Sequence, residues 1–227
     1  MKWLPDPSGR FPQRPFYERE ELDRECEGIV ATFLQARHGR VAYPITTNEL
    51  TILIEQETID LDLYAELSSE GDGVEGVTEF FRRGKPRVRI TEALSAPGRE
   101  NRLRTTLTHE LGHVKFHTFL WTFETPVPRG AASVPPPRCH RETIIDAREV
   151  DWLEWQAGYA SGAFLMPLTA LRRVVRDARR VIGATGSAPL QVENPDGQEL
   201  IRRTQQAFEV SADAARVRLL QLHFLSE

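Results

Sequence analysis

The segment TLTHELGHVKFH, residues 106 to 117, restricts the fold of this chain more than any other stretch. It places His109 and His113 four residues apart in a helical pattern. Both imidazoles therefore project from one helix face, about 6 Å apart along the axis. Two such rings can bind one zinc ion at roughly 2.0–2.1 Å from each nitrogen. Glu110 completes the H-E-x-x-H arrangement, in which the acid is a general base beside a metal. The fold must bring a further ligand to this helix.

His117 continues the four-residue spacing, but helix geometry argues against a site of three histidines. On an unbroken helix it lies about 12 Å from His109 along the axis and is rotated by about 80°. We interpret His117 as a core histidine, with a supporting role beside the ligands as the alternative. Gly112 in the helix interior costs about 1 kcal/mol relative to alanine, which indicates close packing or access at this position.

A catalytic zinc has three protein ligands and one open position, so the third ligand must come from another segment. Glu154 is the favoured candidate, because it opens EWQAGYASGAFLMP, whose small residues predict close packing against the histidine helix. Asp151, one turn earlier, is predicted to orient a ligand or to replace one. By chemistry alone, Glu149, Cys139 and His140 also qualify.

Apolar periodicity and turn residues predict an α+β fold for these 227 residues. A helix is expected up to Gly39, and a second helix opens with Thr46 and Glu49 in capping-box spacing. Three strand-like runs follow, and RRGK between the last two predicts a hairpin turn. This small sheet, expected to be antiparallel, precedes the histidine helix and the helices that close the chain. The runs are IDLDLYAEL, GVTEFF and PRVRIT.

The same patterns predict the domain organisation. Residues 1–19 are rich in proline and are expected to form a loosely ordered lead-in. Residues 20–167 form the predicted catalytic domain, with a proline-rich loop at 119–143. Residues 168–227 are expected to form a helical subdomain that packs on it, with Ser211 as the N-cap of the last helix.

Composition restricts the partners and the location of the chain. The net charge of -4 and the pI of about 5.9 give no electrostatic case for direct nucleic-acid binding. Two cysteines are too few for a disulfide framework. The opening residues lack the apolar run of a signal peptide, and no stretch has membrane-spanning length. A cytoplasmic protein without a membrane partner is expected.

Three segments together resemble the ImmA/IrrE metallopeptidases: RLRTTLTHELGHVKFH, EWQAGYASGAFLMP and AFEVSADAARVRLLQL. That family pairs an H-E-L-G-H helix with a downstream E-x-x-A-N-x-F-A-x-x-L-L-M-P helix. The resemblance covers roughly residues 20–227. It implies a zincin-like, gluzincin-type domain in which His109, His113 and Glu154 bind zinc and Glu110 is the catalytic base.

Two positions depart from the family pattern. Gly158 stands where the family has asparagine, and Ala160 where it has phenylalanine. These changes leave the implied ligands intact and bear on substrate fit.

The resemblance also implies a biological role. It implies a zinc-dependent endopeptidase that cleaves an intracellular helix-turn-helix repressor, relieving repression in a stress response or in mobile-element induction. The alternative is a non-catalytic, zinc-stabilised regulator or toxin–antitoxin component that sequesters a repressor. Glu110 favours the enzyme, because that carboxylate is not needed to hold the metal. Manganese also accepts two histidines and a carboxylate, so the sequence does not choose between the two metals.

Three further hypotheses concern the reaction itself. An oxyanion donor is expected besides the metal, with His140, Tyr159 and His117 as candidates. Cys139, in the proline-rich loop, is a candidate latch that would occupy the open metal position. The strand GVTEFF is either a sheet edge that pairs with an extended substrate or a plain structural strand.

Overall fold

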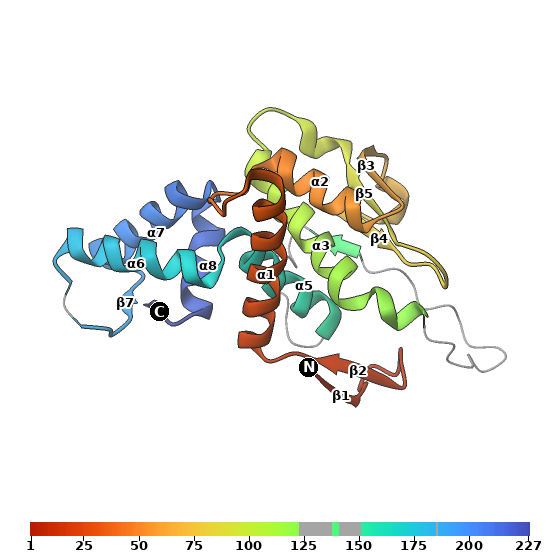
Figure 1. The fold of residues 1–227 in the computed structure, drawn as a ribbon, viewed down its shortest axis with the longest axis horizontal. Coiled ribbons are helices and arrows are strands. Elements are labelled where there is room, and N and C mark those ends of the chain that lie inside the picture. The colour runs from red at the N-terminus through yellow and green to blue at the C-terminus, as the bar shows by residue number, and fades with distance from the viewer. Residues whose placement is uncertain (123–137, 141–150, 185) are drawn as a thin grey trace. The chain divides into compact units, whose positions relative to one another are not determined.

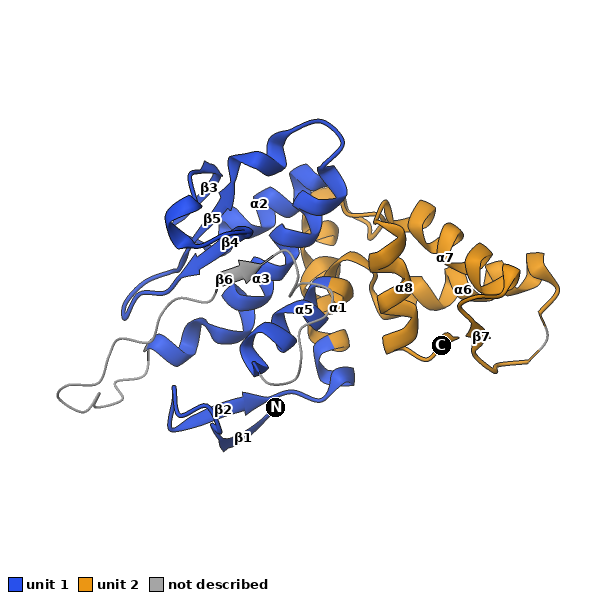
Figure 2. Cartoon of the chain, turned by 180° about the vertical axis from the view of Figure 1, so that it is seen from behind, with its two compact units in different colours: residues 1–22, 47–161 blue, residues 23–46, 162–227 orange. Residues whose placement is uncertain are grey.

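The computed structural model describes the side chains of residues 1–121, 151–184 and 186–227, and the backbone of Thr122 and of Arg138–His140. The chain divides into two compact units (Figure 2). Unit 1 comprises residues 1–22 and 47–161, and unit 2 comprises residues 23–46 and 162–227. This division differs from the predicted boundaries at residues 19 and 167, because most of the first helix belongs with the C-terminal helices.

The elements confirm the α+β class (Figure 1). Among its described residues, unit 1 holds a four-stranded sheet, two α-helices and most of a third, and an N-terminal hairpin. Its helices, with the short 3-10 turns η1 and η2, are α2 (Thr47–Glu57), η1 (Ser68–Glu70), η2 (Glu92–Ser95), α3 (Glu100–Thr122) and α5 (Trp152–Leu165). Its strands are β1 (Lys2–Pro5), β2 (Gln13–Phe16), β3 (Asp60–Ala65), β4 (Val74–Glu79), β5 (Arg87–Thr91) and β6 (Arg138–His140).

The sheet has the strand order β3-β5-β4-β6 and is mixed, which corrects the expectation of an antiparallel sheet. The predicted hairpin is present, since β4 and β5 pair antiparallel. However, β3 pairs parallel with β5. After β3 the chain runs first into β4, which does not lie next to β3, and the hairpin then places β5 between β3 and β4. The backbone of β6 pairs antiparallel with the other side of β4. In this structure β4 is therefore an inner strand and not the sheet edge considered for substrate pairing.

The N-terminal residues form a hairpin, where a loosely ordered lead-in was expected. Strands β1 and β2 pair antiparallel from Lys2 opposite Phe16. The carboxylate of Asp6 closes the connection, because it accepts hydrogen bonds from the Ser8 hydroxyl at 2.8 Å and the Phe11 amide at 3.0 Å. It also accepts a bond from the indole N–H of Trp152 at 3.0 Å. This last bond fixes the hairpin to the start of α5.

Helix α3 lies between the sheet and α5. Glu110 contacts β4 at Gly76, whereas Gly112 contacts Ala157 of α5. Residues two positions apart point to opposite sides of a helix, since each residue turns the helix by about 100°. A Cβ on Gly112 would lie 3.0 Å from the Cα of Ala157, which confirms the close packing expected from the small residues.

In its described residues, unit 2 is helical apart from one short pair of strands. Its elements are most of α1 (Arg19–His38), then α6 (Leu168–Ile182), β7 (Leu190–Gln191), α7 (Pro195–Phe208), α8 (Ala212–Gln221) and β8 (Leu225–Ser226). The predicted N-cap is confirmed, because the Ser211 hydroxyl accepts a bond from the Ala214 amide at 3.1 Å. The guanidinium of Arg218 donates a 2.5 Å hydrogen bond to Asp23, and both side chains are buried. Among the described helices, none has the length and hydropathy needed to cross a membrane.

Candidate metal centre

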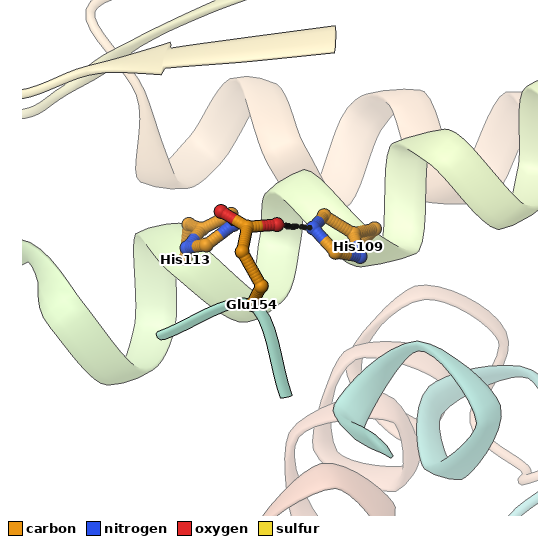
Figure 3. Close-up of side chains that lie close together, drawn as sticks. All are labelled: His109, His113 and Glu154. Atoms are coloured by element: carbon orange, nitrogen blue, oxygen red, sulfur yellow. Dashed lines mark hydrogen bonds and ion pairs between the residues drawn. The ribbon is translucent and has the colours of Figure 1, made fainter. Parts of the chain in front are cut away.

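Two turns of α3 and the first turn of α5 bring three donor side chains together. His109, His113 and Glu154 each offer one ligand atom, and these atoms all lie within 4.8 Å of one another. Figure 3 shows Glu154 reaching from α5 toward both rings on α3. The Nε2 atom of His109 lies 3.1 Å from Glu154 Oε2 and 3.1 Å from His113 Nε2. The Nε2 atom of His113 lies 3.4 Å from Glu154 Oε1.

These distances fit a single metal ion. In a tetrahedral zinc site, ligand atoms about 2.0–2.1 Å from the ion lie about 3.3 Å from one another. The observed separations of 3.1 to 3.4 Å match that spacing. Two imidazoles and a carboxylate are also a donor set that zinc and manganese accept. The cluster is therefore able to bind a divalent cation.

The electrostatics of the cluster agree with a cation site. Burial by itself would raise the pKa of Glu154, but attraction by the His113 ring and hydrogen bonds from both histidines hold that pKa well below its ordinary value. Burial by itself would lower the pKa of His113, but the Glu154 carboxylate raises it. Both shifts have the same cause, the attraction between the Glu154 carboxylate and the positive form of the ring beside it.

Glu110 lies on the side of α3 that faces the sheet. Its side chain is fully buried, and Oε2 accepts a 2.5 Å hydrogen bond from the hydroxyl of Thr78. Burial raises the pKa of Glu110, while both histidine rings and the Thr78 bond oppose that rise. Among the described residues, no group donates a hydrogen bond to Oε1. Glu110 is thus a carboxylate with one oxygen held and the other available for a proton.

Gly76 makes room for this carboxylate. A Cβ at Gly76 would lie 2.5 Å from Oε1 of Glu110, closer than side chains approach one another. Gly76 and Thr78 are two residues apart on β4, so both face α3, as alternate residues of a strand do. One strand therefore supplies both the space for the Glu110 carboxylate and the hydroxyl that holds it.

His117 lies beside the cluster without joining it, as helix geometry predicted. It is absent from the group of three donors and has no exposed surface. Its Nδ1 atom lies 3.0 Å from Nδ1 of His113, and its Nε2 atom lies 3.0 Å from Oε1 of Gln156. Burial lowers the pKa of His117 well below its ordinary value, and the neighbouring His113 adds to this effect. The interpretation as a core histidine was incomplete, because the ring also contacts a donor of the cluster.

Comparison with known proteins agrees with this geometry. Residues 71–220 match the family model Peptidase_M78, described as the IrrE N-terminal-like domain. The chain belongs to this family. The match includes all of the cluster, and membership suggests a metallopeptidase. No curated protein matches the chain.

The other site residues predicted from the sequence of this IrrE-like chain are not among the three donors of the cluster. Asp151 caps α5, accepting the Leu153 amide at 3.1 Å, and pairs with Arg10 at 2.6 Å. The ring of Tyr159 lies 5.7 Å from that of Trp155, and its role as oxyanion donor stays a prediction. The side chains of three ligand candidates lie outside the described residues, and the first of them is also the proposed latch: Cys139, His140 and Glu149.

Three residues around the IrrE-like site escaped the sequence-based prediction. Gly76 and Thr78 form a G-x-T pattern on a predicted strand, and that spacing was the available signal that both share a face. Gln156 follows Glu154 by two residues and had no distinguishing pattern. Its importance depends on His117, which lies 39 residues earlier in the chain.

Proposed function

We propose that this chain is a zinc-dependent endopeptidase in which His109, His113 and Glu154 hold the metal and Glu110 is the general base. The observation that supports this most directly is the buried Glu110 carboxylate. It follows the first donor of the cluster in the sequence, one oxygen is held by Thr78, and the other has no partner among the described residues. A bound divalent cation supplies Lewis acidity, lowering the pKa of a water toward about 7 and polarising the peptide carbonyl.

In this reaction Glu110 moves one proton. Its Oε1 atom accepts a proton from the water whose oxygen attacks the peptide carbonyl carbon. The same carboxyl group then donates that proton to the amine nitrogen as the carbon–nitrogen bond breaks. The water oxygen and its second hydrogen remain in the new carboxylic acid, which then loses that proton to the solvent. The raised pKa of Glu110 suits the first step, because a carboxylate with a higher pKa is a stronger base than an exposed glutamate.

The proposed substrate is a helix-turn-helix transcriptional repressor, and its cleavage would release the genes that it controls. The resemblance of the two motif segments to the ImmA/IrrE metallopeptidases supports this substrate class. Zinc is the favoured metal and manganese the second, since both accept this donor set.

Glu110→Gln tests the proposal. Purified chain loaded with zinc is mixed with the helix-turn-helix proteins encoded beside its gene, and cleavage is followed by gel and mass spectrometry. We expect E110Q to bind zinc as the wild type does and to cleave at least about 10²-fold more slowly, since general bases contribute roughly 10²–10⁴-fold.

The matched control is Glu92→Gln, which makes the same chemical change at an exposed position of η2 and should leave cleavage unchanged. Undiminished cleavage by E110Q would refute the role of the base. A sequestering protein without turnover would leave the repressor intact while binding it, and E110Q would then still relieve repression.

A further inference from the structure

One donor of the cluster is connected by a chain of hydrogen bonds to the N-terminal hairpin. The contacts run from Nδ1 of His113 to Nδ1 of His117, then from Nε2 of His117 to Oε1 of Gln156. The amide nitrogen of Gln156 donates to the carbonyl of Pro15 at 2.9 Å. The first two contacts are 3.0 Å long. His113, His117 and Gln156 are buried, so water does not replace these bonds.

A backbone carbonyl determines the direction of the whole chain of bonds. The Pro15 carbonyl can only accept, so the Gln156 atom that faces it must be the amide nitrogen. The Gln156 oxygen consequently faces His117 and can only accept, so Nε2 of His117 carries a proton. A neutral imidazole has one protonated nitrogen, and Nδ1 of His117 therefore presents a lone pair.

The tautomer of His113 follows from that lone pair. Nδ1 of His113 must donate the hydrogen bond to His117, which leaves the lone pair of the His113 ring on Nε2. That nitrogen is the one that lies 3.4 Å from Glu154 Oε1 and 3.1 Å from Nε2 of His109. The hydrogen bonds therefore direct the metal-binding lone pair of His113 into the cluster.

The two histidines of the cluster differ in whether the ring nitrogen that points away from the cluster has a hydrogen-bond partner. Among the described residues, no group bonds to Nδ1 of His109, although that atom is buried. A metal-binding histidine ordinarily has its other nitrogen held by a hydrogen-bond acceptor, which fixes the ring and its tautomer. Here His113 has such support, and it comes from another histidine and not from a carboxylate.

We propose that His117 and Gln156 are positioning residues that hold His113 as the Nδ1–H tautomer. The chain of hydrogen bonds from His113 through these two side chains is called the relay below, and the Pro15 carbonyl is its fixed end. The inference rests on the proposed metal site, and it does not require that the chain cleave any substrate. The competing explanation is a buried polar cluster that only satisfies its own hydrogen bonds.

The tautomer is measured directly in the metal-free protein. Nitrogen-15 NMR of protein labelled at histidine, at a pH where the rings are neutral, distinguishes a protonated ring nitrogen from one with a lone pair. The wild type should show His113 protonated at Nδ1. His117→Phe keeps an aromatic ring but removes the acceptor, and should give a mixture of tautomers. His117→Asn places an amide oxygen near the position of Nδ1 and should restore the single tautomer.

Zinc affinity is the second measurement, by competition with a chromophoric chelator. His117→Phe should weaken zinc binding by about 10–100-fold, the usual effect of losing such support, whereas His117→Asn should stay within about threefold of the wild type. Phe116→Leu is the packing control, because Phe116 is buried in the same turn as His117 and its ring lies against that of Tyr17. It should leave zinc affinity unchanged.

Three results would overturn the inference: His113 protonated at Nε2 in the wild type, wild-type zinc affinity in His117→Phe, or an equal loss in Phe116→Leu. If His117→Asn did not restore zinc affinity, the role of His117 would be structural, and this result would also overturn the inference. None of these measurements depends on cleavage. A chain with the expected tautomer but no peptidase activity would refute the proposed function and leave this inference standing.

Discussion

Gly76→Ala is the change that most directly tests how β4 positions the carboxylate of Glu110, the proposed general base. A Cβ at this position would lie 2.5 Å from Oε1 of Glu110 and 3.0 Å from its Cγ and Cδ atoms. Ordinary contacts of a Cβ begin at 3.4 Å. The carboxylate would therefore have to move by about 0.9 Å, the difference between 3.4 and 2.5 Å.

That movement stretches the hydrogen bond from Thr78 to Glu110. Hydrogen bonds to charged groups contribute about 1.5–3 kcal/mol. A catalytic group misplaced by about 1 Å lowers the rate by on the order of 10²-fold, which corresponds to about 2.7 kcal/mol. The two magnitudes agree, so we expect Gly76→Ala to reduce cleavage about 10²-fold. Zinc affinity should not change, because the nearest atoms to the new Cβ all belong to Glu110.

The assay compares the cleavage rate at saturating zinc with zinc affinity and with the free energy of unfolding. Gly28→Ala is the matched control, since Gly28 is exposed on α1 and a Cβ there meets nothing within 4 Å. It should leave the rate unchanged and stabilise the helix by up to about 1 kcal/mol. A near wild-type rate for Gly76→Ala, or a loss of rate matched by a loss of zinc, would refute the argument.

Three further predictions concern packing, pH and stability. Gly112→Ala should weaken zinc binding about tenfold in a chelator competition. The new Cβ would lie 3.0 Å from the Cα of Ala157 and would displace α5, which carries Glu154. An unchanged zinc affinity would contradict this prediction. Zinc affinity should fall as the pH decreases through the raised pKa of His113, because a proton and the metal compete for the same ring nitrogen. Calorimetry measures this affinity, and an affinity that does not depend on pH would exclude the competition. Asp23→Ala should lower the free energy of unfolding by about 3 kcal/mol in urea, because it removes a carboxylate from the buried Arg218; a loss under about 1 kcal/mol would show that other partners compensate.

The local features of the fold were predictable from the sequence because each depends on neighbouring residues. The hairpin of β4 and β5 followed from two apolar runs around RRGK, and the last N-cap followed from Ser211. The position of His117 outside the donor cluster followed from helix geometry alone. The small residues after Glu154 correctly indicated the close approach of α5 to α3.

The features that failed or were missed depend on contacts between distant segments. The parallel pairing of β3 with β5 has no local signal, because strand direction depends on where the chain returns to the sheet. The ordered N-terminal hairpin depends on Asp6 reaching Trp152. No sequence pattern in residues 1–16 indicates that contact, and the prolines of this segment led to the expectation of a loosely ordered lead-in.

The sequence by itself determined the donor types, the spacing of His109 and His113 on one helix face, and the place of Glu110 next to them, because a helix fixes the geometry of residues four apart. Only the tertiary structure decided which acid meets those rings, which strand holds Glu110, and which carbonyl orients the His113 relay. Those contacts join segments far apart in the chain. Their geometry arises from packing of α3 between β4 and α5, which no local pattern encodes.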